Sequence, residues 1–227
     1  EGAILAARAG RTEITMADLE EASEKVQMGP ERKSKVVPED EKRVVAYHEV
    51  GHGIVGYIIG GGDRVHKITM IPRGPAGGYT LSLPEEEKSF HSKKYMLNRI
   101  ARYFGGRAAE EIIFGKENIT DGAGSDIYYA TSIAKNIVTK YGMTEKFGPV
   151  FLEATEEDYM LQRKYYSEQT GKEVDDEIRK IITEQYSRAK NILLENRDKL
   201  EEVTRILLEK ETIMGPEFEA IMKNEHI

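Results

Sequence analysis

Two histidines and one glutamate lie in the run HEVGH, residues 48–52, at a spacing that suits metal chemistry. In a helix, side chains four positions apart share a face, so both imidazoles can approach one metal ion. Two neutral imidazole nitrogens at about 2 Å make half of a tetrahedral Zn²⁺ site. The glutamate between them can take a proton from zinc-bound water, which then attacks a polarised carbonyl. The pattern therefore predicts His48 and His52 as zinc ligands and Glu49 as the general base.

The residues around this run strengthen the prediction. The chain has only five histidines, and composition alone would produce the bare pattern in about one chain in a hundred. Residues 43–59 are otherwise apolar and predict a buried helix, in which an unpaired carboxylate would be costly. A metal ion would relieve that cost, whereas the alternative is a surface helix with incidental histidines. The same stretch contains three glycines, Gly51, Gly53 and Gly56. In a helix interior each glycine costs about 1 kcal/mol of stability relative to alanine, which indicates that a metal, a substrate or another helix comes close.

The run supplies two ligands, and the residues around it leave the third open. A histidine six positions after His52 cannot be the third ligand, because that position holds Ile58. A helical glutamate about twenty residues downstream is also excluded, since Pro72 lies in a β-like segment. The remaining candidates for the third ligand are carboxylates, Glu110 or Glu111 in GGRAAEEIIFG and Asp121 or Asp126 in TDGAGSDIYYAT. Two histidines at the starts of predicted elements, His66 and His91, are weaker candidates.

The elements that must position these residues are mostly helical. Between residues 66 and 83, the β-leaning runs HKITMI and GYTLSL flank a proline- and glycine-rich break, which predicts a hairpin or small edge sheet. The predicted fold class is therefore mainly α, with a small β hairpin or edge sheet near the active site. Apolar periodicity predicts two short helices within residues 1–28 and longer helices over 43–59, 89–114, 126–141, 175–195 and 198–210.

Three segments divide the chain. Residues 1–28 contain a capping-box pattern, Thr15 three positions before Asp18. They are too few to bury a core of their own, so we expect them to be the tail of a missing domain. Residues 29–41 are polar, include two prolines and lack periodicity, as expected of a linker. Residues 42–227 form the predicted main domain.

Composition excludes several other classes of protein. The chain has 33 Lys and Arg against 40 Asp and Glu, and its net charge of −7 argues against nucleic acid or an anionic membrane as the main partner. Cysteine is absent, which excludes disulfides, thiolate metal sites and cysteine nucleophiles. The longest apolar stretch, residues 54–59, is far shorter than the roughly 18 residues of a membrane span.

A longer series of motifs resembles a known family. In order along the chain these are VVAYHEVGHGIVG, HKITMIPRG, GGYTLSLPEE, GGRAAEEIIFG and TDGAGSDIYYATSIAKNIVTKYGMTEKFGP, followed by acidic C-terminal helices. Together they resemble the protease domain of the FtsH family, the membrane-anchored AAA+ zinc metalloproteases of bacteria and organelles. The resemblance covers about residues 40–225, and the run EGAILAARAGRTEITMADLEEA within residues 1–28 is similar to the end of that family's AAA+ lid.

The resemblance implies a helical zinc metalloprotease domain that binds one Zn²⁺ per chain. It implies that Asp126 is the third zinc ligand and that Asp121 is a loop or capping residue. Glu110 and Glu111 would then support the ligating histidines by hydrogen bonds or form salt bridges. The parent, meaning the whole protein of which such a protease domain is a part, would be an ATP-dependent processive protease in membrane protein quality control. It would form a homo-hexamer on the cytoplasmic side of the bacterial inner membrane, with its sites facing an internal chamber.

Two family features are missing from the sequence, a GxxxxGK[ST] phosphate-binding loop and a transmembrane segment. ATP and Mg²⁺ are therefore expected only in the missing AAA+ domain of the parent. The chain itself is expected to be soluble, to bind no nucleic acid or membrane, and to have polypeptides as substrates.

Three functions compete at this point: a zinc endopeptidase acting on unfolded polypeptide, a ring-assembly module with an inactive site, and a metal-dependent hydrolase of a small amide. Glu49 favours the first over the second, because a structural zinc site needs no base. The run GGYTLSL favours the first over the third, since an exposed strand edge can pair with an extended peptide. We therefore predict that Gly78, Tyr79, Thr80 and Leu81 bind substrate, the alternative being an ordinary hairpin edge.

Overall fold

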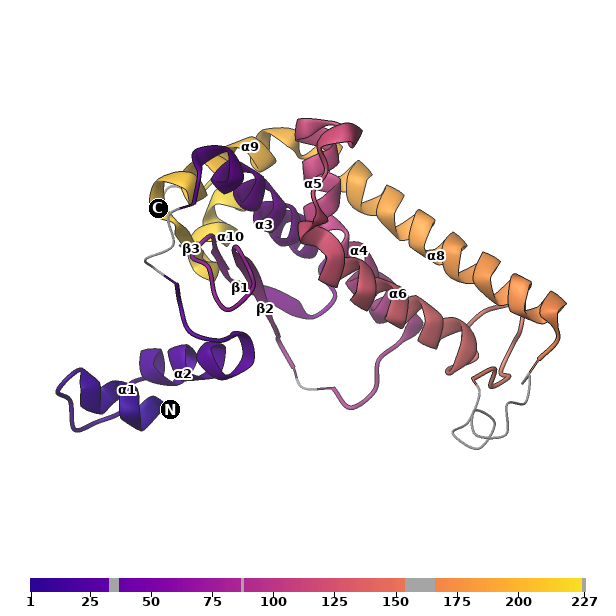
Figure 1. Ribbon diagram of the computed structural model, residues 1–227, viewed down its shortest axis with the longest axis horizontal. Helices are drawn as coiled ribbons and strands as arrows, with labels where there is room; N and C mark the ends of the chain where they lie inside the picture. Colours follow the sequence, from indigo (N-terminus) through magenta and orange to yellow (C-terminus); the bar gives the residue numbers. More distant parts are fainter. Residues whose placement is uncertain (33–36, 87, 154–165, 226–227) are drawn as a thin grey trace.

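The computed structural model describes residues 1–32, 37–86, 88–153 and 166–225, which form a mainly helical fold with one small antiparallel sheet (Figure 1). The predicted fold class is confirmed. Within the described ranges, no helix is both long enough and apolar enough to cross a bilayer. The helices are α1 (Gly2–Arg8), α2 (Met16–Met28), α3 (Glu39–Ile59), α4 (Lys93–Tyr103), α5 (Gly105–Phe114), α6 (Gly124–Thr139), α8 (Glu168–Glu195), α9 (Arg197–Lys210) and α10 (Gly215–Lys223).

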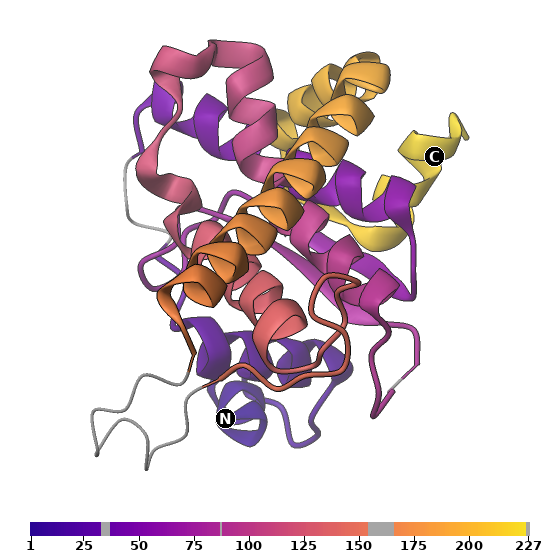
Figure 2. The same cartoon turned by 90° about the vertical axis from the view of Figure 1, so that its right-hand side faces the viewer.

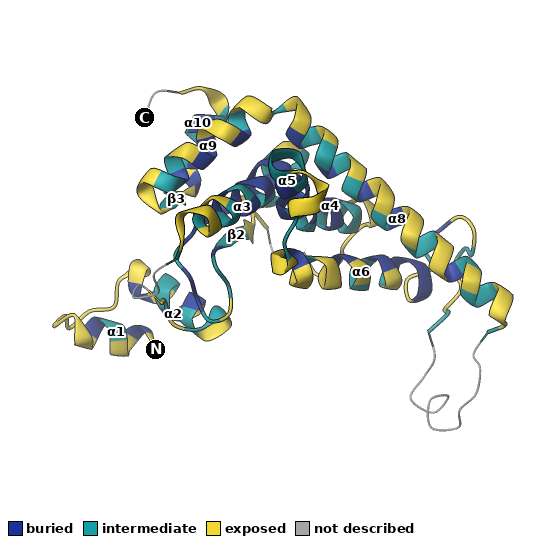
Figure 3. Cartoon of the chain, turned by 45° about the horizontal axis from the view of Figure 1, so that its top comes forward, coloured by how far each residue is buried: buried dark blue, intermediate teal, exposed yellow. Residues whose placement is uncertain are grey.

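Helix α3 lies at the centre of the fold and carries residues 48–52. It begins at Glu39, four residues before the predicted start, because an acidic first turn suits the positive end of the helix dipole. The helix contacts α4, α5, α8, α9 and the sheet, so most of its length is buried or half-buried (Figure 3). This burial holds the HEVGH run in a fixed position.

Residues 89–114 form two helices rather than the one predicted. Helix α4 ends at Tyr103 and α5 begins at Gly105, with a change of direction at Phe104. The change of direction lets α5 pack closely on α3, where Gly105 faces Gly51. A Cβ added to either glycine would collide with the backbone of the other. The apolar periodicity continues through both helices, which is why it did not reveal the break.

Helix α8 lies along one side of the molecule, against the helices around α3. It packs across α4, α5 and α6, as Figure 2 shows. It begins at Glu168, seven residues before the predicted start, since Ser167 caps its first turn by accepting a hydrogen bond from the Thr170 N–H. Helix α10 had no counterpart among the predicted helices.

The sheet has the strand order β2-β1-β3, with β1 (Asp63–Thr69) between β2 (Tyr79–Pro84) and β3 (Thr212–Met214). The predicted hairpin is β1–β2, in which Ile68 is opposite Thr80. The third strand was not predicted, because it has only three residues and pairs with a strand more than a hundred positions away. This pairing leaves β2 as an edge strand of the sheet.

Helix α2 begins with the predicted capping box. The Thr15 hydroxyl accepts a hydrogen bond from the Asp18 N–H, and the Asp18 carboxylate accepts one from the Thr15 N–H. Both short N-terminal helices are therefore where periodicity and capping predicted them. The division into a lid remnant, a linker and a main domain stays a prediction.

A cluster of ion pairs around the buried Arg73 connects the turn between β1 and β2 to α2. Arg73 in this turn is fully buried, and its guanidinium contacts the carboxylates of Glu21, Glu24 and Glu31. The Tyr79 hydroxyl of β2 donates a hydrogen bond of 2.6 Å to Glu24. The strand predicted to bind substrate is therefore held by the N-terminal helix α2.

Candidate metal centre

Helix α3 presents its two histidines toward the N-terminal ends of α5 and α6. His48 and Glu49 are buried, and the side chain of His52 is only 12% exposed. Asp126 lies in the first turn of α6, where the helix holds its carboxylate in a fixed direction. The structure therefore brings Asp126 to the histidines from 74 and 78 positions away in the sequence, since 126 − 52 = 74 and 126 − 48 = 78.

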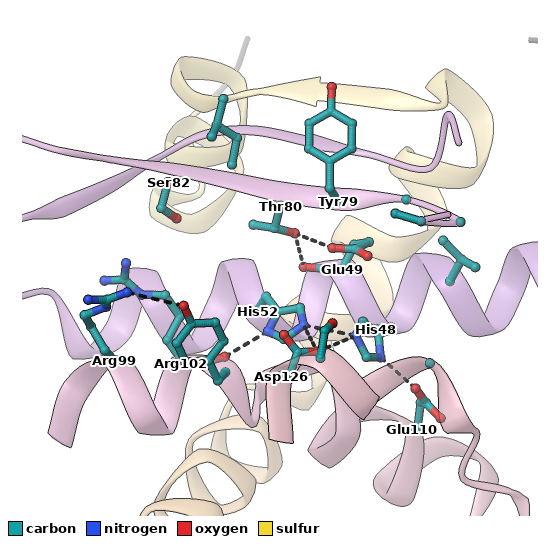
Figure 4. A pocket seen from close by; sticks show the side chains of 18 of the residues that line it. His48, Glu49, His52, Tyr79, Thr80, Ser82, Arg99, Arg102, Glu110 and Asp126 are labelled. Atoms are coloured by element: carbon teal, nitrogen blue, oxygen red, sulfur yellow. Dashed lines mark hydrogen bonds and ion pairs between the residues drawn. The ribbon is translucent and has the colours of Figure 1, made fainter. Parts of the chain in front are cut away.

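Three side-chain atoms converge on one point (Figure 4). His48 Nε2 and His52 Nε2 are 3.0 Å apart, and each lies 3.3 Å from Asp126 Oδ2. A tetrahedral site with bonds of about 2.0–2.1 Å places neighbouring ligand atoms roughly 3.3 Å apart. The spacing and the donor set of two imidazoles and one carboxylate therefore fit Zn²⁺, with a fourth position left for water or substrate.

The opposite nitrogen of each imidazole has its own partner. His48 Nδ1 lies 2.6 Å from Glu110 Oε1, and His52 Nδ1 lies 2.8 Å from the carbonyl oxygen of Arg102. A carboxylate and a carbonyl can only accept, so both Nδ1 atoms carry hydrogen. In the neutral tautomer each Nε2 is then free to bind a metal. Glu110 is itself held by the Thr120 N–H at 2.7 Å and is 1% exposed.

The other candidates from the sequence lie outside the convergence point. Glu111 contacts Tyr186 and Lys190 of α8 instead of a histidine. Asp121 lies in an exposed turn. His66 Nε2 lies 3.6 Å from Glu20 Oε1, and the ring of His91 stacks on that of Tyr95. Of the two adjacent glutamates, therefore, Glu110 faces the cluster and Glu111 forms a salt bridge.

Gly106 is a site residue that the sequence analysis did not single out. A Cβ at this position of α5 would collide with the imidazole of His48. The glycine therefore allows the ring to lie directly against the start of α5. The pair of glycines in GGRAAEEIIFG was the available signal, since two adjacent glycines at a helix start indicate a close approach.

Burial and opposite charges act against each other in this cluster. Burial raises the pKa of Asp126, but the nearby His52 and His48 outweigh it and lower the pKa well below its ordinary value. Burial lowers the pKa of His48, but hydrogen bonds to Asp126 and Glu110 outweigh it and raise the pKa. Carboxylates therefore surround His48 and stabilise positive charge at the point where the three side-chain atoms meet.

Glu49 points from α3 toward β2 (Figure 4). Burial raises the pKa of its carboxyl group. Its Oε2 accepts a hydrogen bond of 2.9 Å from the hydroxyl of Thr80. Residues 78–81 line the same cleft of about 830 Å³ as the two histidines, Glu49 and Asp126. The edge strand and the candidate metal ligands therefore share one cavity.

Comparison with known proteins is consistent with this geometry. A sequence profile of peptidase family M41 matches residues 35–221. The chain is 48% identical over 231 residues to "ATP-dependent zinc metalloprotease FtsH 3" of Petrotoga mobilis, covering 99% of this chain and 36% of that protein. It is 46% identical over 231 residues to "ATP-dependent zinc metalloprotease FtsH" of Thermotoga maritima, covering 99% of this chain and 38% of that protein. The chain thus spans a little over a third of these relatives.

Proposed function

The chain belongs to peptidase family M41, and from this premise we propose that it is a zinc endopeptidase that cleaves unfolded polypeptides. One observation carries the proposal: His48 Nε2, His52 Nε2 and Asp126 Oδ2 lie within 3.3 Å of one another. Family membership also confirms the resemblance to the FtsH protease domain noted in the sequence.

In this proposal, His48, His52 and Asp126 hold one Zn²⁺. When bound, the metal would polarise a substrate carbonyl and make water more acidic. Glu110 and the Arg102 carbonyl keep the two imidazoles turned so that Nε2 faces the cluster. Such partners of ligating histidines commonly change metal affinity by ten- to a hundredfold.

Glu49 is the proposed general base. It lies next to His48 on α3, and its carboxylate is buried in the wall of the cleft. From there it can take a proton from the attacking water and return it to the leaving amine. The intact base argues against a function in ring assembly alone.

The edge strand supports a polypeptide as the substrate. β2 is at the edge of the sheet, and residues 78–81 line the cleft beside Glu49. An extended peptide can pair with such an edge through its main chain, which requires that the substrate be unfolded over several residues. A small amide would leave most of this cleft of about 830 Å³ unused, so the third candidate function is less favoured.

The relatives are named ATP-dependent proteases, and this chain spans only part of them. We infer that a whole protein of this kind binds ATP and Mg²⁺ in an AAA+ domain. In this inference that domain unfolds substrates and delivers them to the proteolytic site. We also propose a homo-hexamer anchored at the cytoplasmic side of the bacterial inner membrane.

Metal content and casein cleavage, measured on the same samples, test the proposed function. We expect about one zinc per chain and ATP-independent cleavage of casein, while a tightly folded protein without a loose tail resists. His48→Ala and His52→Ala should lose zinc and activity together, because two remaining ligands rarely hold Zn²⁺. Glu49→Gln should keep zinc and lose activity.

His91→Ala is the matched control, since His91 stacks on Tyr95 outside the cluster. It should keep both zinc and activity. Full proteolysis by a zinc-loaded Glu49→Gln protein would contradict the role of the base, and stoichiometric zinc in His48→Ala would contradict the metal site.

A further inference from the structure

The two oxygens of the Glu49 carboxylate have different surroundings. Oε2 lies 2.9 Å from the Thr80 hydroxyl, which also lies 2.8 Å from the main-chain carbonyl oxygen of Glu49. Among the described residues, Thr80 is the one side chain that donates a hydrogen bond to this carboxylate. Glu49 is 7% exposed, so little water competes for that hydrogen bond. The other oxygen, Oε1, has no such restraint within the described part of the chain.

The Thr80 hydroxyl has one hydrogen and two possible acceptors. An ionised carboxylate is a stronger acceptor than a neutral carbonyl. A carbonyl in the middle of a helix also already accepts the N–H four residues later. While Glu49 is charged, the hydrogen therefore goes to Oε2. Once Glu49 has taken a proton, its carboxyl group accepts less strongly, and the hydroxyl can turn to the carbonyl oxygen without losing a partner.

We propose that Thr80 is a positioning residue for Glu49: its hydroxyl holds Oε2 and leaves Oε1 to take the proton from water. This inference rests on the proposed function and adds a residue to it. The side chain of Thr80 points from β2 onto Glu49 of α3 in Figure 4, while its neighbour Tyr79 points away toward α2. The strand is therefore anchored on both faces.

The placement of Thr80 links substrate binding to catalysis. β2 is the edge strand along which a peptide is proposed to pair. A peptide that pairs with this strand restrains the same backbone that carries the hydroxyl of Thr80. Glu49 is therefore positioned best when substrate occupies the strand edge. The Thr80 hydroxyl accordingly contributes to kcat more than to KM.

Steady-state kinetics on a fluorogenic peptide separate this role from a purely structural one. Thr80→Val keeps the shape and the main-chain N–H of the strand but removes the hydroxyl. We expect kcat to fall about ten- to a hundredfold, as for the loss of a hydrogen bond to a charged group, with KM and zinc content unchanged. Thr80→Ser keeps the hydroxyl and should restore most of the turnover.

Thr212→Val is the matched control. Its hydroxyl lies in the same sheet, 2.7 Å from the hydroxyl of Thr69, and takes no part in the cleft. It should leave kcat unchanged. A kcat of Thr80→Val equal to that of the wild type, or a Thr80→Ser protein as slow as Thr80→Val, would overturn the inference.

A second measurement does not depend on activity. In metal-free protein, Thr80→Val should lower the denaturation midpoint more in the wild-type background than in the Glu49→Ala background, because only the former loses the contact with the carboxylate. Equal shifts in both backgrounds would overturn the inference. If Glu49→Gln is inactive while Thr80→Val is not impaired, the proposed function stands and only the role of Thr80 fails.

Discussion

Glu110 Oε1 accepts a hydrogen bond of 2.6 Å from His48 Nδ1, and so determines which nitrogen of the ring faces Asp126 and His52. The other oxygen of the same carboxylate accepts the Thr120 N–H. Both oxygens of Glu110 are therefore acceptors, one for His48 of α3 and one for Thr120 in the loop before α6. This carboxylate connects the two segments that contribute to the cluster.

Replacing Glu110 by glutamine should weaken zinc binding. An amide has one oxygen, so it can accept from His48 or from Thr120, but its NH₂ group then faces the other donor. We expect the zinc dissociation constant to rise about ten- to a hundredfold, measured by competition with a chelator. Glu111→Gln is the control, because Glu111 contacts Lys190 and Tyr186 instead. Equal zinc affinities in the two variants would show that Glu110 does not support the site.

Removing the carboxylate of Asp126 should abolish zinc-dependent cleavage. Asp126→Ala leaves only the two imidazoles at the cluster, which rarely hold Zn²⁺ tightly. Asp121→Ala removes a carboxylate from the same loop, but from an exposed turn outside the cluster. Zinc content by mass spectrometry should fall in the first variant and stay near one per chain in the second. Retention of zinc and normal turnover in Asp126→Ala would reverse the assignment.

A methyl group at Gly106 should displace the imidazole of His48. The added Cβ would collide with the ring, so we expect Gly106→Ala to lose zinc affinity. Gly124→Ala is the matched control, since an added Cβ there meets no atom within 4 Å. It should bind zinc normally and gain about 0.4–1 kcal/mol of stability from reduced freedom of the unfolded chain. Circular dichroism and zinc titration of both variants check this, and normal zinc binding in Gly106→Ala would contradict the packing.

The hydrogen bonds that Glu24 accepts from Lys67 and Tyr79 should make stability depend on pH. Burial raises the pKa of Glu24, but hydrogen bonds from Lys67 and Tyr79 outweigh it and lower the pKa in the folded chain. A carboxyl group of this kind contributes stability above its unfolded pKa of about 4.3 and loses that contribution as the pH falls through its folded pKa.

Glu24→Gln should therefore lower the free energy of unfolding by about 1.5–3 kcal/mol at pH 7, and the difference from the wild type should shrink below about pH 4.3. Denaturant unfolding at several pH values measures both effects. Glu20→Gln, on the same helix and partly exposed, should change stability by less than about 0.5 kcal/mol. A difference for Glu24→Gln that is constant across the pH range would contradict this account.

Peptides with methylated main-chain nitrogens should reveal pairing with β2. Successive N–H groups of a strand point to opposite sides, so only every second one can face the edge strand. Methylation at one set of alternating positions should raise KM for cleavage, while methylation shifted by one residue should have little effect. Substrate variants suit this test better than a substitution of Thr80, because the Thr80 hydroxyl also contacts Glu49. Equal effects of both methylation patterns would argue against strand pairing.

The local parts of this protein follow from its sequence. The spacing of His48 and His52 needs only helical geometry, and the α-helical periodicity around them predicts the helix. The capping box of Thr15 and Asp18 and the β1–β2 hairpin are likewise encoded within a few residues. Patterns of this kind depend on neighbours along the chain, so one sequence is sufficient to predict them.

Only the tertiary structure decided the rest. Asp126 and Glu110 reach the histidines across more than fifty positions, and β3 joins the sheet from the far end of the chain. The break between α4 and α5 depends on the packing of Gly105 against Gly51. The hydrogen bond from Thr80 to Glu49 joins a strand to a helix. Local periodicity carries no information on which distant segments meet, because these contacts arise from how whole elements pack.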